Sequence, residues 1–154
     1  MLGLSTTRQV SVGNFIGDAI DAAVGCGFKR ILLVGHIGKL VKLGIHMSNT
    51  HSACGDGRME TLIACALEAG GELPLLRTIL GCATTDAALA AIYAAGLLRP
   101  AMDVLARRIA DSLSRRVPEG VEIGFICFTN AGPCAGILAE SPNARALAAE
   151  WKVE

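Results

Sequence analysis

Aromatic side chains are scarce in this chain of 154 residues: Phe, Tyr and Trp together make up 4% of it, whereas hydrophobic residues as a whole make up 52%. A core with so few aromatic rings must be filled by aliphatic side chains and alanine. The chain is long enough to bury one such core. The composition therefore suits helices packed on a sheet.

The chain also lacks an excess of charge of either sign, with 14 basic and 14 acidic residues. This balance disfavours a nucleic-acid-binding protein that works through a basic surface. The basic pairs Arg107-Arg108 and Arg115-Arg116 are expected on the solvated face of one helix. No apolar run reaches the roughly 18 residues that a membrane span requires, and residues 1–12 lack the apolar core of a signal peptide. We expect neither nucleic acid nor a membrane as a partner.

The six cysteines include no pair spaced as CxxC. Most of them lie in apolar runs, where free cysteine behaves as a small hydrophobe. This usage indicates a reducing cytoplasm. His46, His51 and Cys54 could hold zinc with a fourth ligand, but their spacing matches no established zinc pattern, so no metal site is predicted.

Helical periodicity dominates the chain. Asn14 is expected to cap a helix that ends at Gly25-Cys26-Gly27, and Thr84 to cap an alanine-rich helix that reaches Ala95. Residues 44–57 are polar and contain glycine, so we expect a loop there. The other expected helices cover residues 37–43, 58–69 and 100–116, a short segment that Pro74 begins, and a last segment capped by Asn143.

Only two segments have the pattern of buried strands, residues 30–34 and 121–128. Two strands do not make a stable sheet alone. Either a further strand exists, with residues 75–80 as the candidate, or part of the sheet comes from elsewhere. We therefore expect an α/β fold with helices packed on a small, mostly parallel sheet in three layers, which could be an incomplete piece of a larger protein. Residues 1–12 would be a loop or a frayed segment, and residues 13–154 a single α/β domain.

The residues best suited to chemistry gather within residues 35–60. The segment Gly35–Lys39 follows the first strand and precedes a helix, so it lies at the carboxyl end of that strand. Open α/β folds bind ligands at the edge of the sheet that the carboxyl ends of the strands form. Its glycines would let a ligand approach the backbone, and Lys39 could add a charge for a carboxylate or phosphate. The pattern alone leaves an alternative equally open, a tight turn in which His36 makes a structural hydrogen bond.

Further polar residues lie after this turn and at the end of the second strand. Residues Asn49–Ser52 offer donors, acceptors and the imidazole of His51, although such residues also make a good capping loop. Asp56 and Arg58 are two apart and could pair in a loop. The dipeptide Thr129-Asn130 would lie beside the first turn if the two strands are neighbours.

Several of these segments, taken in order, resemble one family. They are Ser11–Gly17, Ile31–Lys42 with its Gly-His-Ile-Gly-Lys-Leu run, Thr50–Ser52, Asp56 with Arg58–Glu60, and Thr84–Asp86. The family is the cobalt-precorrin-5B C1-methyltransferase of the anaerobic cobalamin pathway. The resemblance runs from about residue 5 to the C-terminus.

The resemblance implies an enzyme that uses S-adenosylmethionine to methylate C1 of the corrin precursor and helps to remove a two-carbon fragment, giving cobalt-precorrin-6A. Members of the family are much longer, so this chain resembles their C-terminal part. The alternative is a non-catalytic domain that binds the tetrapyrrole or dimerises, and a homo-oligomer is compatible with either view. Ile37 stands where proline is common in the family, and Gly55 and Gly57 stand where alanines usually flank the aspartate.

Spacing and position in the family together suggest the site residues. His36 and His51 are the expected catalytic, proton-transfer groups, since histidine changes charge near neutral pH. The carboxylates of a tetrapyrrole call for cationic and polar partners. The expected cofactor-binding residues are Asn14, Gly35, Gly38, Thr129 and Asn130, and the expected substrate-binding residues are Lys39, Asn49, Thr50, Ser52, Asp56 and Arg58.

Overall fold

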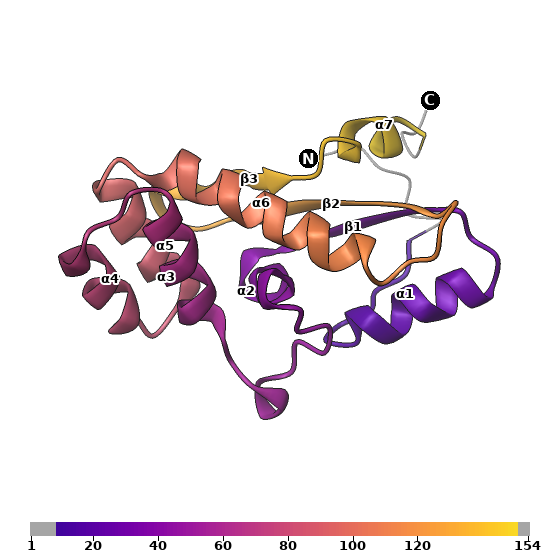
Figure 1. The fold of residues 1–154 in the computed structure, drawn as a ribbon, viewed down its shortest axis with the longest axis horizontal. Helices are drawn as coiled ribbons and strands as arrows, with labels where there is room; N and C mark the ends of the chain where they lie inside the picture. The colour runs from indigo at the N-terminus through magenta and orange to yellow at the C-terminus, as the bar shows by residue number, and fades with distance from the viewer. Residues whose placement is uncertain (1–8, 151–154) are drawn as a thin grey trace.

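The computed structural model describes residues 9–150, arranged as Figure 1 shows. The strands lie in the order β1-β2-β3, with β1 at Arg30–His36, β2 at Glu122–Thr129 and β3 at Gly136–Glu140. β1 is parallel to β2, and β3 is antiparallel to β2. Of the predicted N-terminal segment, residues 1–8 lie outside the described residues, and residues 9–12 form neither helix nor strand. The α-helices are α1 (Ile16–Gly25), α2 (Ile37–Leu40), α3 (Arg58–Glu68), α4 (Leu73–Leu80), α5 (Thr85–Ala94), α6 (Leu98–Ser114) and α7 (Ala144–Ala149), and the 3₁₀ helices are η2 (Val41–Ile45), η3 (Ser52–Cys54) and η4 (Gly132–Cys134).

Helices cover both faces of the sheet, which gives three layers. α7 packs on one face of β1 and β2, while α2 and α6 pack on the other (Figure 1). Side chains along β2 alternate accordingly: Phe125 and Cys127 lie in the main core, whereas Ile126 packs with Leu32 against α7. The predicted α/β class, with helices on a small and mostly parallel sheet, is confirmed.

The main core is built largely by helices. α3, α4 and α5 form a group at one end of the molecule and pack against one another (Figure 1). Thr84 caps α5 as predicted, because its hydroxyl oxygen accepts a hydrogen bond from the Ala87 N–H at 3.2 Å. α6 corresponds to the predicted longest helix, although it begins and ends two residues earlier than predicted, and it buries a stripe of Met102, Leu105, Ile109 and Leu113.

The third strand is β3, and the suggestion of a strand at residues 75–80 is wrong, because those residues lie in α4. Pro74 stands in the first turn of α4, where proline needs no N–H partner. β3 is only 5 residues long, and its pairing with β2 rather than its own pattern makes it a strand. Within the described residues, β3 completes a sheet that two strands could not form.

Neither Asn14 nor Asn143 makes the side-chain cap that the sequence suggested. Phe15, not Asn14, stands at the N-cap of α1, and the Asn14 amide oxygen instead accepts a hydrogen bond from the Thr50 hydroxyl. Asn143 stands at the N-cap of α7 as expected, but its side chain makes no cap hydrogen bond, and its amide instead donates to the Ile123 carbonyl of β2. In both cases a contact with a distant segment takes the side chain that a local cap would have used.

Gly124 on β2 allows α7 to lie close to the sheet. A Cβ at this position would lie 2.8 Å from both Leu147 Cδ1 and Asn143 Oδ1. Gly124→Ala should therefore displace α7 and lower the free energy of unfolding, measured by urea denaturation, by about 1–3 kcal/mol. Gly25→Ala is the control, because a Cβ there meets nothing within 4 Å. The control should be neutral or stabilising, and equal losses in both variants would contradict this packing.

Candidate functional site

A cleft of about 280 Å³ lies between the turn that follows β1 and the loop over residues 49–58. The turn and the loop both belong to the part of the chain in which the sequence concentrates its polar residues. All but one of the residues that line the cleft are predicted site residues, Lys42 being the exception. The lining residues are Asn14, Gly38, Lys39, Lys42, Thr50, His51, Ser52 and Arg58.

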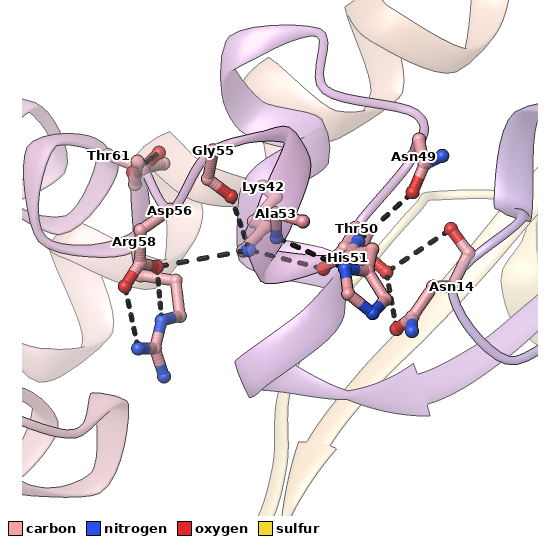
Figure 2. A network of polar contacts seen from close by, with 11 residues as sticks. Asn14, Lys42, Asn49, Thr50, His51, Ala53, Gly55, Asp56, Arg58 and Thr61 are labelled. Atoms are coloured by element: carbon pink, nitrogen blue, oxygen red, sulfur yellow. Dashed lines mark hydrogen bonds and ion pairs between the residues drawn. The ribbon is translucent and has the colours of Figure 1, made fainter.

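The ammonium group of Lys42 lies at the centre of this site (Figure 2). Its side chain is only 4% exposed. Nζ donates hydrogen bonds to the carbonyl oxygens of Thr50 at 3.1 Å and Gly55 at 2.9 Å. These two carbonyls replace the water that burial removes from the ammonium. The same two bonds fold the segment between Thr50 and Gly55 back over Lys42.

Asp56 and Arg58 form an ion pair beside Lys42, as their spacing in a loop suggested (Figure 2). Arg58 donates through Nη2 to Asp56 Oδ2 at 2.7 Å and through Nε to Oδ1. The hydrogen bonds from Arg58 hold the pKa of the Asp56 carboxyl below its ordinary value. Asp56 Oδ1 also lies 3.9 Å from Lys42 Nζ. Because one carboxylate faces two cations, the cluster keeps an excess of positive charge.

Thr50 connects the cleft to the segment before α1. Its N–H donates to the Asn14 carbonyl at 2.9 Å, and its hydroxyl lies 3.3 Å from the Asn14 amide oxygen. Thr50 is buried, whereas Asn14 is partly exposed and lines the cleft. The predicted substrate role of Thr50 and cofactor role of Asn14 therefore concern two side chains in direct contact.

His51 presents one imidazole nitrogen to solvent. Its Nδ1 accepts a hydrogen bond from the Ala53 N–H at 3.1 Å and so caps η3. Since Nδ1 is an acceptor, the neutral ring carries its proton on Nε2. Nε2 makes no hydrogen bond to the residues that the structure describes. Asn49 supports this loop, because its amide oxygen accepts from the His51 N–H at 3.1 Å.

A second polar group lies at the carboxyl ends of β1 and β2, which are neighbours as the prediction required. His36 Nδ1 accepts a hydrogen bond from the Gly38 N–H at 3.1 Å and so caps α2. His36 Nε2 lies 3.2 Å from Thr129 Oγ1, and the Thr129 hydroxyl donates to Asp86 Oδ1 at 2.8 Å. Both nitrogens of His36 are therefore engaged, which is the structural hydrogen bonding that the sequence left open.

Four of the predicted cofactor-binding residues lie at or near the carboxyl ends of β1 and β2, and their surroundings differ. They are Gly35, Gly38, Thr129 and Asn130. Thr129 is 1% exposed, whereas Asn130 is exposed and makes no side-chain hydrogen bond to a described residue. A Cβ on Gly35 would lie 3.1 Å from Leu40 Cγ, so Gly35 lets β1 pass close to α2. Of this group only Gly38 lines the cleft. The cofactor-binding roles of all four residues stay predictions.

Lys42 is the site residue that the sequence analysis missed. It stands between Val41 and Leu43, both of which are buried. A lysine inside a buried apolar run must find partners for its ammonium group, since lysine is almost never fully buried unless paired. That local pattern was the available signal, although it does not identify the partners.

The zinc alternative finds no support in residues 9–150, which contain no group of three or more His, Cys, Asp or Glu side chains that could hold a metal ion. All six cysteines are free thiols. Burial raises the pKa of Cys127 to about 12 and that of Cys65 to about 11, so these two thiols stay protonated at neutral pH.

The sequence model of a family described as CbiD, C-terminal domain, matches residues 49–141. The chain belongs to this family. The match contains the loop over residues 49–58 and therefore one side of the cleft, as well as Asp86 and Thr129.

Curated relatives agree with this family. A Klebsiella pneumoniae protein is 37% identical over 143 residues and a Salmonella newport protein 44% identical over 143 residues, and both matches cover 92% of this chain and 35% of the relative. A Fusobacterium nucleatum protein is 32% identical over 149 residues, covering 97% of this chain and 38% of the relative. All three are named cobalt-precorrin-5B C(1)-methyltransferase, which confirms the predicted resemblance to that family.

The chain thus spans little more than a third of the length of these relatives. No solved structure matches it. Among the helices of residues 9–150, none is both long and apolar enough to span a lipid bilayer.

Proposed function

We propose that this chain is the part of a cobalt-precorrin-5B C(1)-methyltransferase that binds the carboxylates of the tetrapyrrole substrate. The whole enzyme would transfer the methyl group of S-adenosylmethionine to C1 of cobalt-precorrin-5B. It would also release the two-carbon fragment to give cobalt-precorrin-6A, in cobalamin biosynthesis. The names of the relatives support the reaction class. The free cysteines fit a reducing cytoplasm, which is the proposed location.

The charge of the cleft is the observation that carries this proposal. Lys39, Lys42 and Arg58 line it, and no carboxylate is among the described residues that do so. The nearby Asp56 is already engaged by Arg58. A cleft of this kind favours a polyanion, and a precorrin carries many carboxylates that such cations can bind.

The chemistry proposed for the site follows from what the reaction needs. Methyl transfer from a sulfonium needs a carbon nucleophile held in line, and the protein need not supply a nucleophile of its own. Release of the acyl fragment needs a group that moves a proton. We assign that role first to His51, because its Nε2 makes no hydrogen bond to a described residue, whereas His36 would have to give up a hydrogen bond.

A second function is favoured by the short span of the chain, which matches 35–38% of the relatives' length. In this view the chain is a non-catalytic domain that binds the tetrapyrrole or dimerises, and S-adenosylmethionine binds to other parts of the full enzyme. In both views the cleft binds the carboxylates of the tetrapyrrole. They differ in where the methyl donor binds.

Calorimetric titration of the 154-residue chain separates the two functions. The two ligands are S-adenosylhomocysteine and uroporphyrin, a tetrapyrrole with many carboxylates. Saturable binding of both would place the cofactor pocket in this chain. Uroporphyrin binding alone would support the non-catalytic domain. Binding of neither by a chain that circular dichroism shows to be folded would contradict both functions for this chain.

A charge variant tests whether the cleft is the binding site. Lys39 is exposed at the cleft, so Lys39→Met should weaken uroporphyrin binding about 2–5-fold through the loss of one accessible ion pair. Arg99→Met is the matched control, because the 84% exposed Arg99 on α6 does not line the cleft. Equal weakening in both variants would indicate that only the overall charge attracts the ligand.

A further inference from the structure

A hydrogen-bonded chain connects the start of α5 to the wall of the cleft. Asp86 lies in the first turn of α5, and its carboxylate can only accept hydrogen bonds when ionised. The Thr129 hydroxyl must therefore donate to Asp86 Oδ1, at 2.8 Å. With its only hydrogen used, the Thr129 oxygen can only accept from His36 Nε2, at 3.2 Å. The Ala131 N–H, 3.3 Å away, supplies a second donor to the same oxygen.

Contacts at both of its nitrogens decide where the proton of the neutral His36 ring lies. Nε2 must carry a hydrogen in order to donate to Thr129, so the neutral ring leaves a lone pair on Nδ1. That lone pair accepts the Gly38 N–H at 3.1 Å. The opposite tautomer would set two hydrogens against each other at Nδ1 and two lone pairs against each other at Nε2. Each hydrogen bond in the chain from Asp86 through Thr129 and His36 to Gly38 therefore has only one possible donor and one possible acceptor.

The packing around Gly38 leaves this arrangement little freedom. A Cβ on Gly38 would lie 3.3 Å from His36 Nδ1 and 3.6 Å from Thr85 Oγ1. The backbone of Gly38 thus lies close to both the imidazole ring and the start of α5. Gly38 and Lys39 in turn line the cleft.

We propose that Asp86 is a positioning residue that, through the Thr129 hydroxyl and together with the Gly38 N–H at Nδ1, fixes the Nε2–H tautomer of His36 and thereby holds the Gly38–Lys39 wall of the cleft. This role rests on the proposed function, since the wall is that of the proposed binding cleft. Asp86 itself does not line the cleft. It acts on the binding site only through Thr129 and His36.

The test is nitrogen-15 NMR of the imidazole rings in the uniformly labelled chain, at about pH 8.5, where an ordinary imidazole is neutral. His36 should show one tautomer, with the hydrogen on Nε2. Asp86→Asn should add a detectable share of the Nδ1–H tautomer, because an amide can donate as well as accept and only the Gly38 N–H then still imposes a direction. Asp103→Asn on α6 is the control, since this 58% exposed carboxylate pairs with Arg99, and it should leave His36 unchanged.

Two substitutions of Thr129 test the same link without touching Asp86. Thr129→Val removes the hydroxyl at similar volume and should likewise add a detectable share of the Nδ1–H tautomer, whereas Thr129→Ser keeps the hydroxyl and should preserve the single tautomer. A mixture in the unmodified chain, or an unchanged tautomer in both Asp86→Asn and Thr129→Val, would overturn the proposal. Because the spectra are recorded without a ligand, such a failure is distinct from a failure of the chain to bind uroporphyrin.

Discussion

His51→Ala, made at the aligned histidine of a full-length family member, should lower kcat about 100-fold or more, because a positioned acid–base side chain contributes about 10²–10⁴-fold. In this chain His51 lines the cleft and its Nδ1 accepts from the Ala53 N–H, whereas its Nε2 makes no hydrogen bond to a described residue. The proposed reaction releases an acyl fragment and needs such a group. Steady-state turnover of cobalt-precorrin-5B measures the loss.

His51→Asn separates this chemistry from the folding of the loop. Asparagine keeps a side-chain oxygen that can accept from the Ala53 N–H, as histidine does at the N-cap of η3. It has no titratable nitrogen, so kcat should fall as far as in the Ala variant. His46→Ala is the matched control, because His46 is 57% exposed and does not line the cleft. Undiminished kcat in His51→Asn would remove His51 from the mechanism.

The two histidines that the sequence treated alike differ in the structure. Both follow an extended segment, and both use Nδ1 to cap a short helix. His36 additionally meets Thr129, which a strand 93 residues away supplies, whereas His51 meets no such partner among the described residues. Sequence spacing predicted that the two strands could be neighbours, but it did not predict that Thr129 would occupy the second nitrogen of His36.

Local signals account for the part of the fold that the sequence predicted. Pro74 and Thr84 mark helix starts by the geometry of their own residues, and the spacing of Met102 and Leu105 on α6 follows the helical period. β3 escaped prediction because a strand of 5 residues next to a turn carries little pattern. Its existence depends on the edge of β2, which the sequence does not display.

The candidate site shows the same division between local and distant contacts. The pairing of Asp56 with Arg58 follows from their spacing in a loop, and it was predicted. The burial of Lys42 depends on the chain folding back so that Thr50 and Gly55 turn their carbonyls toward it. Such a contact joins residues up to 13 positions apart through irregular backbone, for which no periodic pattern exists.

Lys42→Met should lower the free energy of unfolding by about 2–4 kcal/mol. Each of the two hydrogen bonds that Lys42 donates from its charged group contributes about 1.5–3 kcal/mol, and packing of the methionine side chain recovers part of this loss. The substitution leaves the carbonyl oxygens of Thr50 and Gly55 without their donor. The segment between them should then loosen, and the positive charge that faces the substrate should fall. Urea denaturation of the chain measures the first effect, and uroporphyrin titration of the folded variant measures the second.

Lys39→Met is the control that separates the two effects of Lys42. Lys39 is exposed and makes no side-chain hydrogen bond to a described residue, so its substitution should change stability by less than about 0.5 kcal/mol. Both variants lose one positive charge at the same cleft, and both should weaken uroporphyrin binding. If Lys42→Met were as stable as the unmodified chain, the ammonium would not hold the loop. If it bound uroporphyrin undiminished, the cleft would not owe its affinity to the buried charge.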